Sequence, residues 1–193
     1  NFNLMKLNMG DIMDYELNLR KADVIGLYIH YVLLVIGILI TGYIIYSNII
    51  RGYYIVALPY IMSMFAFLAI IIYSTTNYEK ATTFYKIGVI LFIGNILFAL
   101  PPQYIAHGLL VVSLSIMEII LLIYFILHLD DSKHAQTAIN LVVIIGIANL
   151  AIMTINTGNL GGNLGTKLLY TFPGLIIQGT LALSYYLATK KIK

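Results

Sequence analysis

Long apolar stretches joined by short polar links make up most of this chain. A bilayer core is about 30 Å thick, so a helix needs about 20 mostly apolar residues to cross it. Six stretches of the 193-residue chain meet that requirement. The predicted transmembrane segments are residues 24–50, 54–73, 82–100, 104–129, 137–155 and 168–189.

The composition excludes a water-soluble fold. Of all residues, 61% are hydrophobic and only 10% are charged, whereas soluble domains have about 25% charged residues. Only helices and closed barrels span bilayers, because unpaired backbone groups are too costly in lipid. Barrel strands alternate apolar and polar residues, but these stretches are apolar on all sides. The sequence therefore predicts an all-α integral membrane protein, a bundle of about six transmembrane helices with no soluble domain.

The basic residues are distributed unevenly over the predicted loops. An even number of helices puts both termini on one side, and nine of the eleven Lys and Arg residues lie there. These nine are Lys6, Arg20, Lys21, Lys80, Lys86, Lys133, Lys190, Lys191 and Lys193. The opposite side carries only Arg51 and Lys167. Cytoplasmic loops are enriched in Lys and Arg, so we expect cytoplasmic termini and a location in the cytoplasmic (plasma) membrane.

Two segments outside the predicted helices have patterns of their own. Residues 1–23 mix charges with apolar residues and are interpreted as a cytoplasmic tail lying on the membrane, with a docking arm for a partner as the alternative. Residues 156–167 contain a tandem Gly-Asn-Leu-Gly repeat from Gly158 to Gly165. A phosphate-binding P-loop would need a Lys-Ser/Thr pair, which this segment lacks. It is therefore interpreted as an external loop.

Glu118 is an acidic residue in the middle of an apolar stretch. An ionisable side chain at membrane depth is costly and is therefore a candidate for function. At about 100° per residue, a helix over 104–129 would align His107, Val111, Ser115, Glu118, Leu122 and Phe125 in one stripe. Glu118, His107 and Ser115 are thus candidates for an ion, proton or substrate pathway. The alternative is structural, because a buried Glu can stay protonated and hydrogen-bond to amides on neighbouring helices.

Three amide side chains, Asn95, Asn149 and Gln178, also lie in the middle of predicted helices. Polar side chains at such positions commonly join helices, at about 0.6–2 kcal/mol each. We therefore expect helix–helix polar contacts from all three. Pro59 and Pro173 are expected to kink their helices.

The four histidines raise the question of a haem or metal site. Bis-His haem needs two ligands at similar depth on facing helices, and only His30 and His128 are conceivable as such a pair. Their predicted depths match poorly, so no haem or other cofactor is predicted. His134 shares a segment with Asp130 and Asp131, where a solvated loop is the default. The lack of cysteine excludes disulfides, Cys-ligated zinc and Fe–S clusters.

Three functional hypotheses follow. The first is a membrane-embedded, non-catalytic subunit of a larger complex for transport or energy transduction, which fits the small size and short loops. The alternative is a small oligomeric transporter or channel for a solute, cation or proton that uses Glu118 and His107. A haem-carrying or other membrane enzyme is the second alternative, although the sequence has no catalytic motif. The expected partners are lipid and other membrane subunits or further copies of the chain, without nucleic acid.

Overall fold

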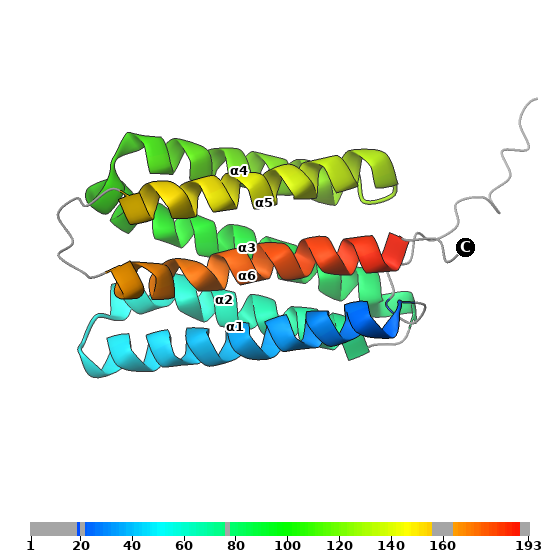
Figure 1. Cartoon of the computed structure of the whole chain (residues 1–193), viewed down its shortest axis with the longest axis horizontal. Coiled ribbons are helices and arrows are strands. Elements are labelled where there is room, and N and C mark those ends of the chain that lie inside the picture. Colours follow the sequence, from blue (N-terminus) through cyan, green and yellow to red (C-terminus); the bar gives the residue numbers. More distant parts are fainter. Residues whose placement is uncertain (1–18, 20–21, 76–77, 156–163, 190–193) are drawn as a thin grey trace, which may run out of the picture.

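The computed structural model describes residue 19 and residues 22–75, 78–155 and 164–189. These residues form six helices and no strand (Figure 1). The helices are α1 (Val24–Ile50), α2 (Tyr54–Thr75), α3 (Tyr78–His107), α4 (Leu109–Leu127), α5 (Ser132–Ile155) and α6 (Leu164–Thr189). All six are long and apolar enough to cross a membrane. The predicted all-α bundle of six membrane-spanning helices is confirmed.

The boundary between the third and fourth helices is not where the sequence predicted it. We expected the third helix to stop at Leu100, but α3 continues through Pro101 and Pro102. A proline removes one backbone donor and crowds the carbonyl four residues back, which can kink a helix without ending it. The chain instead reverses at Gly108, whose φ of 78° costs glycine little because it has no Cβ.

Away from this boundary, α2, α3, α5 and α6 each extend beyond the predicted apolar limits at one end, and α4 ends two residues earlier than predicted. α1 has the predicted bounds, and α5 begins at Ser132, five residues before the expected start. Asp131 explains this early start, because its carboxylate accepts hydrogen bonds from the backbone N–H groups of Lys133 and His134. Such a cap satisfies donors that would otherwise be unpaired at a helix start. The predictions for residues 1–18 and for the glycine-rich repeat up to residue 163 lie outside the described residues.

The six helices form a closed ring of neighbours, and α6 is the member of the ring that also reaches across it. Each helix contacts the next one along the chain, and α6 contacts α1 at the closure of the ring. α6 also contacts α2 and α3 across the bundle. Figure 1 shows all six axes running along the long dimension of the molecule, so that consecutive helices are antiparallel. α6 therefore connects helices on opposite sides of the ring.

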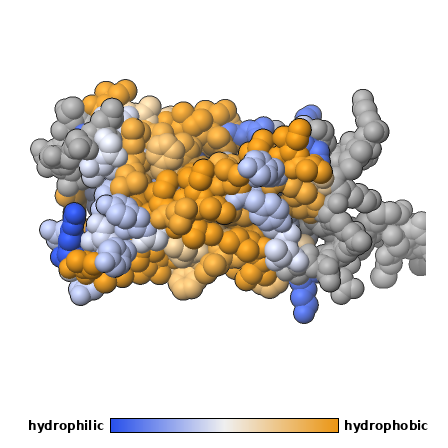
Figure 2. All heavy atoms as spheres, turned by 60° about the horizontal axis from the view of Figure 1, so that its bottom comes forward, coloured by the Kyte–Doolittle hydropathy of each residue, from blue (hydrophilic) through white to orange (hydrophobic). Residues whose placement is uncertain are grey.

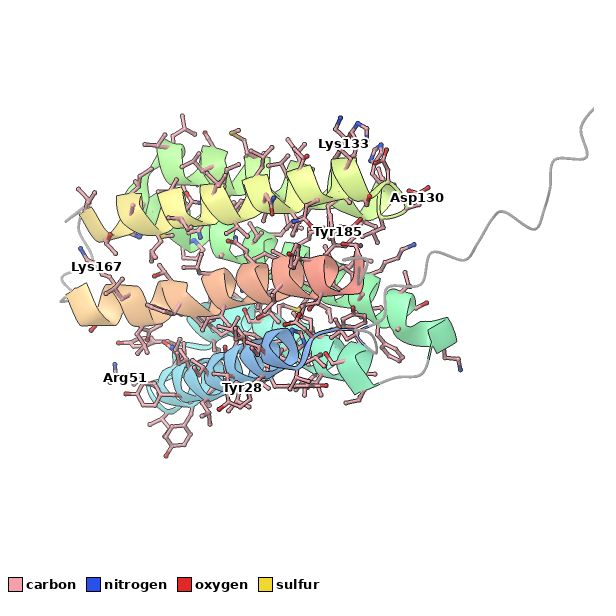
Figure 3. The ribbon with its side chains drawn as sticks, turned by 45° about the vertical axis from the view of Figure 1, so that its right-hand side comes forward. Tyr28, Arg51, Asp130, Lys133, Lys167 and Tyr185 are labelled. Atoms are coloured by element: carbon pink, nitrogen blue, oxygen red, sulfur yellow. The ribbon has the colours of Figure 1, made fainter. Side chains whose placement is uncertain are left out.

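The bundle has two polar ends and an apolar middle. Arg51 and Lys167 lie at one end, here named the Arg51 end, and Asp130 and Lys133 lie at the other, the Lys133 end (Figure 3). Apolar side chains on the outside, such as Leu39, are exposed. Figure 2 shows a broad hydrophobic band across the middle of one face, with hydrophilic residues gathered toward the ends. This surface suits lipid, as expected for a multi-pass membrane protein, while the orientation in the membrane stays a prediction.

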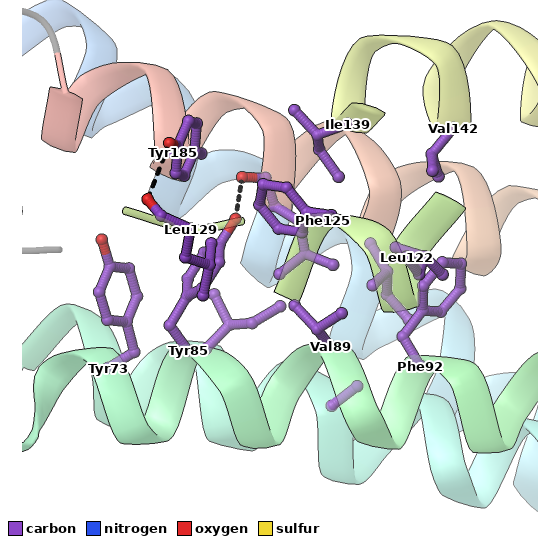
Figure 4. Packing of buried hydrophobic residues seen from close by; sticks show 14 of the residues in the cluster. Tyr73, Tyr85, Val89, Phe92, Leu122, Phe125, Leu129, Ile139, Val142 and Tyr185 are labelled. Carbon is purple, nitrogen blue, oxygen red and sulfur yellow. Dashed lines mark hydrogen bonds between the residues drawn. The ribbon is translucent and has the colours of Figure 1, made fainter. Parts of the chain in front are cut away.

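Large aromatic side chains fill the half of the bundle nearest the Lys133 end (Figure 4). Tyr73, Tyr85, Phe125 and Tyr185 are almost fully buried and form successive edge-to-face contacts with centroids 5.1, 6.0 and 5.2 Å apart. The Tyr85 hydroxyl donates to the carbonyl of Leu181 at 2.7 Å. The Tyr185 hydroxyl donates to the carbonyl of Leu129 at 3.1 Å. These contacts join α2, α3, α4 and α6 and close this half of the bundle.

The close approach of α1 to α2 depends on Gly37. A Cβ atom at this position would collide with the ring of Phe67, which is fully buried. We expect Gly37→Ala to lower the free energy of unfolding by about 1–3 kcal/mol, because the ring has no free space to move into. Thermal or denaturant unfolding in detergent measures the change. Gly42→Ala is the matched control on the same helix, since its nearest atom, Met64 Cε, would be 3.6 Å away. Equal stability of the two variants would contradict this account.

Candidate functional site

A cavity of about 370 Å³ lies between α2, α3, α4, α5 and α6. Its lining residues come from the halves of these helices nearest the Arg51 end, and none comes from the described part of α1. His107 and Lys167 line it near that end, whereas Glu118 and Gln178 line it near the middle of the bundle. Beyond Glu118, toward the Lys133 end, lie the buried residues Leu122 and Phe125 of the aromatic half. The cavity is therefore polar at its mouth and at its base, and it is closed on the side of the Lys133 end.

Glu118 is the centre of a polar cluster at the base of the cavity. Its side chain is only 4% exposed. Oε1 accepts a hydrogen bond from Asn149 Nδ2 on α5 at 2.9 Å, and Oε2 accepts one from Gln178 Nε2 on α6 at 3.1 Å. Ser115, one turn earlier on α4, has its hydroxyl 3.4 Å from Asn149 Nδ2. The acidic residue thus joins three helices. We name Glu118, Asn149 and Gln178 the Glu118 cluster.

The stripe predicted on the fourth helix corresponds to the buried face of α4, except for one residue. The buried residues of α4 are Val111, Ser115, Glu118, Leu122 and Phe125. His107 was predicted on the same helix, and this was wrong because it is the last residue of α3. Gly108 interrupts the helix between His107 and α4. His107 still lines the mouth of the same cavity.

Gln178 reaches Glu118 because a glycine faces it. A Cβ atom on Gly146 of α5 would coincide with the amide of Gln178. A glycine inside a helix costs about 1 kcal/mol relative to alanine, so a lone glycine in an apolar helix is a sign of close approach. Gly146 was not among the residues predicted from the sequence, although this sign points to it.

Asn95 makes a helix contact of its own, away from Glu118. Its Nδ2 donates to the carbonyl of Pro59 at 2.7 Å and to Ser63 Oγ at 2.8 Å, both on α2. All three residues line the cavity. Asn95 therefore joins α3 to α2 on one wall of the cavity, while Asn149 and Gln178 join α5 and α6 to α4.

Two tyrosines and a glutamine complete the upper part of the cavity. The Tyr60 hydroxyl donates to the carbonyl of Tyr170 at 2.8 Å, and the two rings meet edge to face at 5.6 Å. Ser115 Oγ donates to Gln103 Oε1 at 3.0 Å. The sequence analysis missed Tyr60, Tyr170 and Gln103, because tyrosine and glutamine near a predicted helix end are ordinary interfacial residues and nothing local distinguishes these three.

His30 and His128, the pair considered for haem, are held by different parts of the protein. His30 is fully buried, with Nε2 2.8 Å from Ser74 Oγ and Nδ1 3.2 Å from Ser184 Oγ. Both ring nitrogens are thus engaged with hydroxyl groups. His128 ends α4, where Nδ1 donates to the carbonyl of Tyr124 at 2.9 Å. Within the described residues, no three His, Asp or Glu side chains gather as metal ligands would.

Asp131 and His134 form an ion pair at the start of α5. His134 Nδ1 lies 2.5 Å from Asp131 Oδ2, and both side chains are exposed. The hydrogen bond from His134 is the main reason why the pKa of Asp131 is lowered from its ordinary value of 3.8. Its carboxylate also accepts the backbone N–H groups of His134 and Lys133. Asp131 therefore acts as the cap of α5, and His134 is hydrogen-bonded to its carboxylate.

No family model, curated protein or solved structure matches this chain. Its function is therefore inferred from the residues of the cavity and their geometry.

We expect Gly146→Ala to displace Gln178 from Glu118. The buried carboxyl would lose one of its two amide donors, which destabilises the fold by about 1–3 kcal/mol. Unfolding in detergent measures this change, and Gly179→Ala is the control because nothing lies within 4 Å of its added Cβ. A double variant that combines Gly146→Ala with Gln178→Ala tests whether the collision with Gln178 causes the loss of stability. Gly146→Ala should cost much less in that background, and an equal cost in both backgrounds would contradict the proposed collision.

The Asp131 cap predicts a pH effect with a definite sign. Because the pKa of this carboxyl is lower in the folded protein, its contribution to stability is complete above pH 3.8 and is lost as the pH falls through the folded value. His134→Gln should move the pKa of Asp131 back toward 3.8, as measured by carboxyl ¹³C NMR. Lys133→Gln should leave it unchanged, since only the backbone of Lys133 contacts Asp131. An unchanged pKa in the His134 variant would refute the pairing.

Proposed function

We propose that this protein is a small membrane transporter that binds a solute in the cavity next to Glu118. The observation that carries the proposal is a buried carboxyl group at the closed base of a cavity that reaches one polar end of the bundle. With the Arg51 end outside, as the distribution of basic residues predicts, the solute would enter from the outside. The lining is formed by five helices, so a bound solute would contact most of the bundle.

The size and lining of the cavity support solute binding. Small-molecule sites usually measure about 300–1,000 Å³ and combine apolar walls with a few polar groups. The cavity measures about 370 Å³. Phe92, Ile96 and Leu175 belong to its apolar wall, and Glu118 and Asn149 are polar groups at its base. An ion alone would leave most of this volume unused.

The closed half of the bundle favours a carrier over an open channel. The aromatic residues around Phe125 and Tyr185 occupy the route from Glu118 to the Lys133 end. Passage therefore needs a rearrangement of helices, as in alternating-access transporters. Pro59 and Pro102 line the cavity, and Pro173 lies within α6. Prolines weaken the local hydrogen bonding of a helix and are common points of bending, so three of the five lining helices have a bending point at this level.

A subunit of a larger membrane complex is the second candidate function. The observation that favours it is the same closed half, because a partner bound to the bundle could drive the rearrangement that releases the solute. The two candidates differ in what Glu118 does. In a transporter it contacts the solute, whereas in a purely structural subunit it would only join α4, α5 and α6.

The test is solute exchange in proteoliposomes with labelled methylamine, alanine, glucose and acetate as the first panel. We expect exchange of at least one compound and a loss of roughly tenfold or more in Glu118→Gln, since hydrogen bonds to a charged group contribute about 1.5–3 kcal/mol. The folded yield should stay near normal because Gln keeps the shape and still accepts one amide N–H. Its new NH₂ group can donate to the carbonyl oxygen of Asn149 or Gln178, neither of which has a donor among the described residues. Thr41→Val is the control, since Thr41 is buried on α1 away from the cavity. Normal exchange in Glu118→Gln would remove Glu118 from the mechanism, and a loss of co-purifying subunits instead would favour the second candidate.

A further inference from the structure

We infer that the solute is a primary amine in its ammonium form, bound with its charged end at Glu118 and its apolar part in the upper cavity. This inference rests on the proposed function of the cavity as a solute site. Three observations carry it: the carboxyl group at the base, the excess of acceptors there, and the apolar wall above.

The carboxyl group of Glu118 accepts no hydrogen bond from a cationic side chain of the described residues. Both carboxyl oxygens accept hydrogen bonds, but from the neutral amides of Asn149 and Gln178. The ion pair of Asp131 and His134 lies at the Lys133 end, away from Glu118. Two amide N–H donors directed at the two oxygens suit an ionised carboxylate, and a buried charge is stable only when it is paired. A cationic solute would supply the missing charge.

The Glu118 cluster also has more acceptors than donors. A carboxylate offers about four lone-pair sites, and the amides of Asn149 and Gln178 use two of them. Asn149 Oδ1 and Gln178 Oε1 are buried and have no donor in the described structure. A primary ammonium group brings three N–H donors and a positive charge. An anion would be repelled by the carboxylate, and an alcohol would bring one donor and no charge.

The space above Glu118 argues for an organic cation over an inorganic one. A water-sized occupant needs only about 10–15 Å³, far less than the cavity of about 370 Å³. Phe92, Ile96, Leu150 and Met153 form apolar parts of the wall and would contact a hydrocarbon chain or ring. The basic residue of the lining, Lys167, lies at the mouth. The ammonium end is therefore directed inward, toward the one carboxylate.

The probes for the test are 2-phenylethylamine and three analogues of similar shape: its N,N,N-trimethyl derivative, 2-phenylethanol and 3-phenylpropionate. Binding is measured by calorimetry on the purified protein in detergent at pH 7. We expect the amine to bind at least roughly tenfold more tightly than each analogue, because only the amine has both charge and donors. Glu118→Gln should remove this preference, and Glu118→Asp, which keeps the charge, should retain part of it. Thr41→Val should bind like the unchanged protein.

A second measurement locates the probe in the cavity. The chain has no cysteine, so Thr171→Cys creates a single thiol in the cavity lining. We expect 2-phenylethylamine to slow its modification by a water-soluble thiol reagent, and Glu118→Gln to abolish this protection. Ser132→Cys, exposed at the start of α5 at the Lys133 end, should be modified at the same rate with and without the amine.

The possible failures separate the inference from the proposed function. Tighter binding of 3-phenylpropionate or 2-phenylethanol, with protection of the thiol at position 171, would overturn the ammonium assignment and leave solute binding intact. Full competition by sodium or potassium chloride, with equal binding of all organic probes, would replace it with an inorganic cation site. Binding of none of the four probes would overturn the assignment as well. The proteoliposome exchange of the unchanged protein would then decide by itself whether the cavity transports a solute.

Discussion

The cost of leaving polar groups unpaired in lipid shapes the structure of this protein. Backbone groups are paired within six helices, because water is absent from the bilayer core. The same requirement applies to side chains inside the bundle. Asn95 donates to a carbonyl and a hydroxyl of α2, and Glu118 accepts from Asn149 and Gln178. These few polar contacts determine which helices meet and at what depth, because apolar contacts between helices compete with equally apolar lipid.

The two halves of the bundle differ because their interior residues differ in size. Toward the Lys133 end, α2, α3, α4 and α6 contribute Tyr73, Tyr85, Phe125 and Tyr185, and these rings fill the centre. Toward the Arg51 end, the lining includes small residues such as Gly146, which make room for polar side chains and leave a cavity. One half therefore holds the helices together, and the other contains the cavity that we propose as the solute site. Glu118 lies at the boundary between them.

The sequence predicted what depends on local pattern. The length of the apolar stretches gave six helices, and the period of the helix gave the buried face of α4, including Ser115 and Glu118. Two results required knowledge of distant parts of the chain. Three amides were equivalent as partners of Glu118, and only the arrangement of helices selects Asn149 and Gln178 and turns Asn95 toward Pro59. The end of α3 could not be predicted from local rules either. Those rules place a helix end before Pro101, but α3 continues through Pro101 and Pro102 and ends at His107, and Gly108 separates it from α4.

The choice of glutamate at position 118 argues for a use of its charge. A glutamine there would have nearly the same shape and could still accept a hydrogen bond, so it could join α4, α5 and α6 without the cost of burying an ionisable group. Both carboxyl oxygens instead receive amide N–H donors, while the carbonyl oxygens of those amides are left without donors of their own. This arrangement suits a negative charge at the base of the cavity but supplies no positive charge to neutralise it. In the proposed transporter, a cationic solute would supply that charge and would be released when the helices around the cavity move.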